Sequence, residues 1–162
     1  MNRVKIFIAV TFTAFLMSFM SSQPQEERSV PFIDEDGRAG TIKGQFEDNA
    51  VKKLWFVSET ETGNYEEYYS FQEGLSSVVV KETTFNRPKF WNESLARAND
   101  DTEWFDPSKS RTTSITHFFS NGKYEFSENE NGERSYPVNK RLRKAGEIFL
   151  KKADDYLHAL SK

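Results

Sequence analysis

The Asn121-Gly122 dipeptide is the feature that most constrains how this chain folds. It lies between two runs of alternating apolar and polar residues within Thr112–Glu130. A type I′ turn needs a positive φ at both central residues, and asparagine followed by glycine meets that need best. The segment therefore predicts a β-hairpin, with one strand on each side of the turn.

An earlier segment repeats this arrangement. The aromatic run Tyr68–Phe71 leads to a glycine turn at Gly74, and a second run follows it. That second run contains Val78–Val80, which favours a strand because branching at Cβ suits the pleated surface. We therefore predict a second hairpin, with strands at Tyr65–Phe71 and Leu75–Thr84.

Two more alternating runs precede these hairpins, at Thr41–Glu47 and Val51–Ser58. In the second run Leu54 and Phe56 lie on one face, whereas Trp55 lies on the other. Alternation with a period of two is typical of a strand, and large apolar groups on both faces favour a central one.

The last part of the chain has helical periodicity, and Asn139 is well placed to cap its start. One apolar stripe at spacings of three and four comprises Leu142, Ala145, Phe149, Ala153, Tyr156 and Leu160. Basic residues are expected largely off this stripe, namely Arg141, Arg143, Lys144, Lys151 and Lys152. A helix of about 20 residues that closes the core of the sheet is the favoured interpretation, with a coiled-coil or membrane-surface role as the alternative.

Together these elements predict an α+β fold, an antiparallel β-meander of about six strands with a C-terminal amphipathic helix packed on the sheet.

Residues 1–22 have a different character. A short basic start is followed by the apolar run Ile6–Met20 and then by polar residues, the pattern of a secretory signal peptide. This run is shorter than the roughly 20 residues that span a bilayer, so a cleaved signal is favoured over a retained anchor. We expect residues 1–22 to be a signal peptide, 23–38 a polar leader and 39–162 a single domain.

Composition narrows the partners and the compartment. The chain has no cysteine, which excludes disulfides, thiol chemistry and zinc sites built from thiolates, and fits a bacterial periplasm or cell surface. Without Arg3 and Lys5 of the signal peptide, 20 basic and 25 acidic residues remain, a net charge of −5. We therefore expect an exported protein with no nucleic-acid partner, no attraction to an anionic membrane and no stable membrane span after signal cleavage.

Residues 85–111 interrupt the regular rhythm of strands and short turns. Connections longer than about 12 to 15 residues are usually functional or disordered, and this one is rich in aromatic residues that favour burial. Asn92–Ala98 is able to form two helical turns, and Asp106-Pro107-Ser108 is typical of a turn. We predict a structured excursion packed over an edge or face of the sheet.

This excursion supplies the candidate interaction surface. Its members are Arg87, Phe90, Trp91, Trp104, Asp106 and Lys109. Arg87 and Lys109 each stand beside a proline turn, where a charged donor can pin the loop to backbone carbonyls or to Asp106. The function expected is a non-enzymatic module that binds a protein or an envelope component. The alternative is a carbohydrate-binding domain in which Trp91, Trp104 and Trp55 present aromatic faces to sugar rings, although such residues are more often local core.

Catalytic and metal signatures are absent from the sequence. Neither G-x-S-x-G nor H-E-x-x-H occurs, and His117 and His158 are explained by strand packing and by the helix dipole. The acidic stretch Asp34–Gly37 fits a tight turn better than a calcium loop, which would begin at Phe32 and end at Lys43. We expect no catalytic residue, no metal and no cofactor. A glycoside hydrolase using two of the excursion's carboxylates is the remaining alternative, drawn from Glu93, Asp100, Asp101, Glu103 and Asp106.

Four short motifs together resemble a group of uncharacterised bacterial exported proteins. They are Tyr68-Tyr69 before Gly74, Asn86-Arg87-Pro88, Asp106-Pro107-Ser108-Lys109-Ser110, and Phe118-Phe119-Ser120-Asn121-Gly122-Lys123. The resemblance spans roughly residues 34–160. It implies export and a β-rich fold, and it implies no particular reaction.

Overall fold

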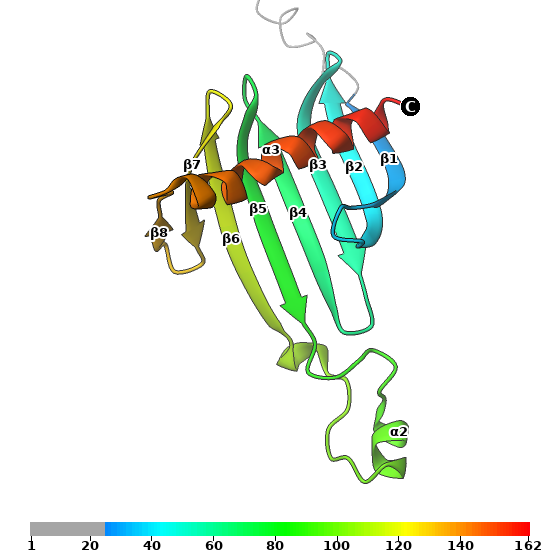
Figure 1. Ribbon diagram of the computed structural model, residues 1–162. Coiled ribbons are helices and arrows are strands. Elements are labelled where there is room, and N and C mark those ends of the chain that lie inside the picture. Colours follow the sequence, from blue (N-terminus) through cyan, green and yellow to red (C-terminus); the bar gives the residue numbers. More distant parts are fainter. Residues whose placement is uncertain (1–24) are drawn as a thin grey trace, which may run out of the picture.

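The computed structural model describes residues 25–162, so the predicted signal peptide lies outside the described residues. Eight strands form one antiparallel meander in which each strand pairs with its neighbours in sequence, and helix α3 crosses one face of the sheet (Figure 1). This confirms the predicted α+β class and the C-terminal helix packed on the sheet. Among the described residues, none of the helices has the length and apolar character needed to cross a bilayer.

The strands follow the chain from one edge of the sheet to the other. They are β1 (Glu26–Ile33), β2 (Ala39–Glu47), β3 (Ala50–Glu59), β4 (Gly63–Phe71), β5 (Leu75–Thr84), β6 (Arg111–Ser120), β7 (Lys123–Asn129) and β8 (Arg134–Ser135). Within residues 25–162 the helical segments are α2 (Glu93–Ala98), the 3₁₀ turn η2 (Pro107–Lys109) and α3 (Lys140–Leu160).

The predicted count of about six strands was two short. Strand β1 occupies the segment expected to be a polar leader, where Val30 and Phe32 pack against the core. Pro31 obscured it in the sequence, but an edge strand tolerates a residue that donates no backbone hydrogen bond. Strand β8 has only two residues, which is too short to produce an alternating pattern.

The turns follow their predicted chemistry. Asn121 and Gly122 have φ values of 50° and 70°, which is the positive pair that a type I′ hairpin requires. In the turn after β1, the Asp34 carboxylate accepts the backbone N–H groups of Asp36 at 3.0 Å and Arg38 at 2.7 Å. This carboxylate is therefore committed to shaping a turn, as the sequence indicated.

Helix α3 closes the core over the covered face of the sheet. It begins after Asn139, whose side chain accepts the N–H of Leu142 as predicted for a cap. Tyr156 lies at the centre of the interface, with its ring centroid 5.5 Å from that of Phe56, 5.2 Å from Phe32 and 5.6 Å from Tyr69. The buried cluster also contains Ile42, Phe46, Leu54, Val78, Phe119, Tyr124, Ala153 and Leu160.

Gly146 allows α3 to approach β7 closely. A Cβ atom at this position would lie 2.3 Å from the ring of Tyr124. The absence of a side chain therefore sets the distance between the helix and the sheet at this crossing.

Two details of α3 differ from the prediction. Lys152, expected off the apolar stripe, is buried, whereas Leu142, expected on it, is largely exposed. The physical reason for the first is a buried partner on the sheet, described below. The second arises because the start of α3 lies near the edge formed by β7 and β8, where little of the sheet lies beneath it (Figure 1).

Candidate functional site

The excursion begins and ends at two residues that pair with each other. Thr84, the last residue of β5, lies opposite Arg111, the first residue of β6. A two-residue turn would be enough to join such a pair. The intervening segment instead extends past the end of the sheet (Figure 1), and it does not lie over an edge or face as predicted. Its aromatic groups pack on one another, as Phe85 and Phe105 do with ring centroids 5.3 Å apart.

Side-chain hydrogen bonds tie the two limbs of the excursion together. Asn86 donates to the carbonyl of Trp104 at 3.0 Å and accepts the N–H of Asp106 at 3.1 Å. The indole N–H of Trp91 donates to the carbonyl of Glu103 at 3.1 Å. These bonds join residues 12 to 20 positions apart in sequence, so the excursion has a defined internal structure.

Arg87 pins the loop, but not to Asp106 as predicted. Its Nη2 atom lies 3.0 Å from a carboxylate oxygen of Asp101 and 3.6 Å from one of Glu103. The pKa of Asp101 is lowered because its carboxylate accepts the backbone N–H of Glu103 and because Arg87 lies beside it. A carboxylate held in its ionised form this way is poorly suited to act as the general acid of a glycosidase.

Asp106 and Lys109 have different environments. Asp106 caps η2 by accepting the N–H and the hydroxyl of Ser108, and these two hydrogen bonds lower its pKa. Lys109 forms no ion pair with any residue in 25–162 and is exposed. Asp106 is therefore a structural cap, whereas the Lys109 ammonium is accessible to a partner.

Some large apolar side chains of the excursion are exposed, and others are partly buried. Phe90 is 57% exposed and Trp104 is 43% exposed, and Leu95 on α2 is also exposed. Trp91 is half-buried, with its ring centroid 6.5 Å from that of Phe90. The exposure of Phe90 and Trp104 differs from the burial that the sequence favoured for aromatic residues in this segment, and Leu95 is exposed beside them in sequence.

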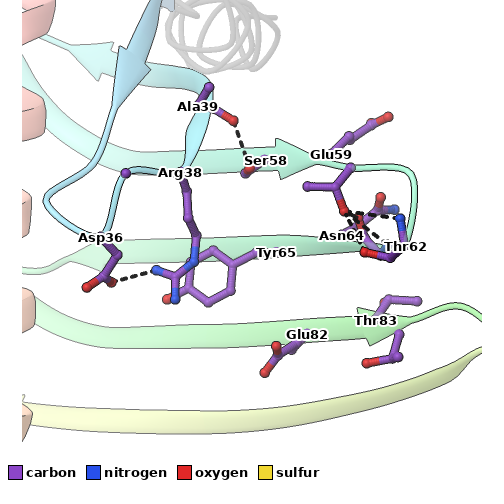
Figure 2. Close-up of a pocket in the computed structure, with 14 residues that line it drawn as sticks. Asp36, Arg38, Ala39, Ser58, Glu59, Thr62, Asn64, Tyr65, Glu82 and Thr83 are labelled. Carbon is purple, nitrogen blue, oxygen red and sulfur yellow. Dashed lines mark hydrogen bonds and ion pairs between the residues drawn. The ribbon is translucent and has the colours of Figure 1, made fainter. Parts of the chain in front are cut away.

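An open pocket of about 500 Å³ lies where the excursion meets the sheet (Figure 2). Its walls come from the β1–β2 turn, β3, the β3–β4 turn, β4 and β5. The excursion is attached at this point, because the N–H of Phe85 donates to the carbonyl of Thr62 at 2.9 Å and that of Lys89 to Glu61 at 2.8 Å. The pocket and the excursion are therefore neighbouring parts of one end of the molecule.

Arg38 is the principal charged side chain in this pocket. Figure 2 shows its guanidinium over the ring of Tyr65, 4.2 Å from the ring centroid, and it also contacts Asp36 at 2.6 Å. The hydroxyl of Tyr65 donates to the carboxylate of Glu67 at 2.6 Å. Tyr65 thereby connects the pocket to a buried polar cluster under α3.

Glu67 is the centre of that cluster and is fully buried. Its carboxylate accepts hydrogen bonds from Tyr65 and Tyr69 at 2.6 Å, from Tyr156 at 2.9 Å and from the Lys152 ammonium at 2.8 Å. Burial, followed by the neighbouring Glu67 charge, raises the pKa of the three tyrosines. The Glu67 charge is therefore compensated by four hydrogen-bond donors. The bonds from Lys152 and Tyr156 also join α3 to β4.

Sequence reasoning missed this cluster, although a signal for it was present. Alternation along β4 places Tyr65, Glu67 and Tyr69 on the same face, and Val78 on the neighbouring strand identifies that face as buried. A carboxylate between two tyrosines on a covered face needs a cation. Lys152 on the last helix meets that need.

His117 on β6 is held as an uncharged ring, in keeping with its predicted structural role. Its ring lies 4.5 Å from that of Phe149 and 5.8 Å from that of Tyr124, centroid to centroid. Burial lowers the pKa of His117 to about 4. Its Nδ1 atom has no hydrogen-bond partner within residues 25–162.

We expect this histidine to make stability depend on pH between about 6.5 and 4. As the pH falls through this range, the unfolded chain takes up a proton that the folded chain does not accept, so stability decreases. Allowing for partial exposure, the loss should be about 1–2 kcal/mol. Urea unfolding of the protein and of a His117→Phe variant at both ends of the range measures it. Equal pH slopes in the two proteins would contradict the assignment.

Comparison with protein-family models, with curated proteins and with solved structures finds no match to this chain. The resemblance of its short motifs to bacterial exported proteins therefore stays a prediction. Any inference about function therefore rests on the structure of residues 25–162.

Proposed function

We propose that this protein is an exported, non-enzymatic binding module that recognises a protein or envelope component through the excursion at residues 85–110. One observation carries the proposal. A segment of 26 residues replaces a connection that needs two, and it exposes Phe90 and Trp104 on a framework held by its own hydrogen bonds.

We infer a role in recognition for Phe90 and Trp104, because exposed side chains contribute little to folding. Phe90 and Trp104 project from a part of the chain that extends beyond the sheet (Figure 1), so their exposure leaves apolar area unburied. Exposed apolar groups on a structured loop are typical of binding surfaces, and aromatic residues are frequent energetic centres of such surfaces. A loop already ordered by internal contacts loses less entropy when it binds.

The electrostatics of the excursion also favour binding over catalysis. Arg87 neutralises Asp101 and Glu103, and Asp106 is used as a cap. Acid–base hydrolysis requires one carboxyl group with a raised pKa beside one that is ionised. The pKa values of two excursion carboxyl groups, Asp101 and Asp106, are instead lowered by their hydrogen bonds.

A carbohydrate ligand is the second candidate, and one observation favours it. The Trp104 ring is exposed while its backbone carbonyl is held by Asn86, which gives a positioned aromatic face. Trp91 is half-buried with its N–H already bonded, and Trp55 lies on β3, outside the excursion. A sugar would therefore meet one exposed tryptophan in this excursion.

The test compares the full chain with a shortened variant in which Asn-Gly joins Thr84 directly to Arg111. Both are used to capture partners from the envelope fraction of the source cell, and both are screened against a panel of oligosaccharides. A double variant, Phe90→Ser with Trp104→Ser, removes only the exposed rings. Ile115→Ser is the matched control, since Ile115 is an exposed apolar residue outside the excursion.

We expect one saturable partner that the full chain and the Ile115→Ser control bind alike. The shortened and double variants should bind it at least about tenfold more weakly, the loss typical of removing an aromatic centre from an interface. Binding by an oligosaccharide that requires Trp104 would support the carbohydrate candidate instead. Identical partners for the full and shortened chains would contradict the proposal.

A further inference from the structure

The first turns of α3 carry an unusual concentration of positive charge. Lys140, Arg141, Arg143 and Lys144 are all exposed, and none of them forms an ion pair with another residue in 25–162. The stretch 136–151 has five basic residues and one acidic residue, a net charge of +4 in a chain whose formal net charge is −3. The chain is acidic as a whole, but the start of α3 is a cationic region.

These charges do not serve the helix itself. The N-terminal end of a helix dipole favours negative side chains, and the first turn of α3 has no acidic residue. Cations placed there lower the stability of the helix by a small amount. Their position is better explained by an external negative partner than by folding.

Exposed apolar side chains lie among the same cations. Val138 is 83% exposed and Leu142 is 45% exposed, and Tyr136 and Ile148 are exposed as well. Ala145 and Ile148 line a groove of about 630 Å³ together with three basic residues, Arg141, Lys144 and Lys151, and two acidic ones, Glu35 and Glu147. Lys151 in this groove is already paired with Glu35 at 2.6 Å.

We propose that the region comprising residues 136–148 docks onto the surface of an anionic lipid bilayer. A basic helix with exposed apolar residues binds such a surface by placing its apolar groups at the headgroup boundary and its cations against lipid phosphates. Charge complementarity selects an anionic leaflet over a neutral one. The excursion extends past the end of the strands that lies farther from α3 (Figure 1), so it is not part of this docking surface. This inference does not depend on the role of the excursion.

The absence of cysteine allows a local test. A Val138→Cys variant of the full chain is labelled with an environment-sensitive fluorophore and mixed with vesicles of phosphatidylcholine alone or with about one third phosphatidylglycerol. We expect a blue shift and an emission increase of at least about twofold with the anionic vesicles only, reversed by about 0.5 M salt. A label at Lys43→Cys, an exposed position on β2, should not respond.

A charge variant completes the test. Changing Lys140, Arg141, Arg143 and Lys144 to glutamine, with the label kept at position 138, should raise the anionic lipid needed for half-maximal response at least about tenfold. The matched control changes four exposed lysines of the sheet strands to glutamine, namely Lys43, Lys53, Lys81 and Lys123.

Residues 6–20 are present in every variant, so any attachment through that apolar segment is common to all of them. The label reports only the environment of the start of α3. The proposal is overturned if the label at position 138 responds equally to neutral and anionic vesicles or not at all. It is also overturned if the two glutamine variants respond alike, because the cations at the start of α3 would then not determine the binding.

Discussion

A Glu67→Ala substitution should lower the free energy of unfolding by about 3–5 kcal/mol, the usual effect of removing one partner from a buried ion pair. The buried Lys152 ammonium would lose its nearest counter-charge and keep only the more distant carboxylates of Asp34 and Asp36, at 3.9 and 4.0 Å. Tyr69 and Tyr156 would lose the acceptor that their hydroxyl groups share. Equilibrium unfolding in urea measures the change through the midpoint of the transition.

The reciprocal change separates charge from packing. Lys152→Met alone should cost a similar amount, because the Glu67 carboxylate would lose its cation. Combining Lys152→Met with Glu67→Leu should recover part of the loss, since a buried pair is often replaceable by apolar groups of similar volume. With Glu67→Leu alone completing the cycle, additive losses in the double variant would show that the two residues do not act as a pair.

A Tyr156→Ala substitution should be comparably damaging, with a loss of about 3–5 kcal/mol. Its ring fills the space among Phe32, Phe56 and Tyr69 where α3 meets the sheet. Thermal and urea unfolding both measure this loss. Tyr156→Phe keeps the ring and removes only a hydrogen bond to an ionised group, so its loss should be about 1.5–3 kcal/mol.

Asp154→Ala provides the control for the helix, because Asp154 is exposed and makes no ion pair with a residue in 25–162. Its effect should stay within about 0.5 kcal/mol. If Tyr156→Ala were as mild as this control, α3 would not be closing the core.

The sequence was sufficient where local chemistry determines structure. Asn121-Gly122 predicts its own turn because few residue pairs accept two positive φ values, and Asn139 predicts the start of α3 because its side chain replaces a missing backbone acceptor. Alternation predicted that Leu54 and Phe56 share one face of β3, and the structure shows that this face is buried. Each of these features is decided within a few residues.

Features that depend on distant partners were not predicted. Glu67 and Lys152 are 85 positions apart. Alternation along β4 offers a signal that Glu67 is buried, but its partner is recognisable only once β4 and α3 are placed together. The partners predicted for Arg87 were backbone carbonyls or Asp106, whereas its partner is Asp101, because the fold of the excursion decides which carboxylate lies beside it. Of the candidate site, the sequence identified Phe90 and Trp104, but not the pocket formed around Arg38.

These observations combine into one description of the molecule. The sheet and α3 form a scaffold held by the core around Tyr156 and by the Glu67 cluster. The excursion extends from one end of this scaffold and presents the surface that we propose for recognition. We therefore expect the scaffold to fold without the excursion.

Urea unfolding of the chain in which Asn-Gly joins Thr84 to Arg111 tests this claim most directly. We expect one cooperative transition for the shortened chain. Its free energy of unfolding should be unchanged or raised by up to about 2 kcal/mol, because a shorter loop costs less entropy to close. A loss greater than about 2 kcal/mol, or a transition that is no longer cooperative, would show that the excursion belongs to the core.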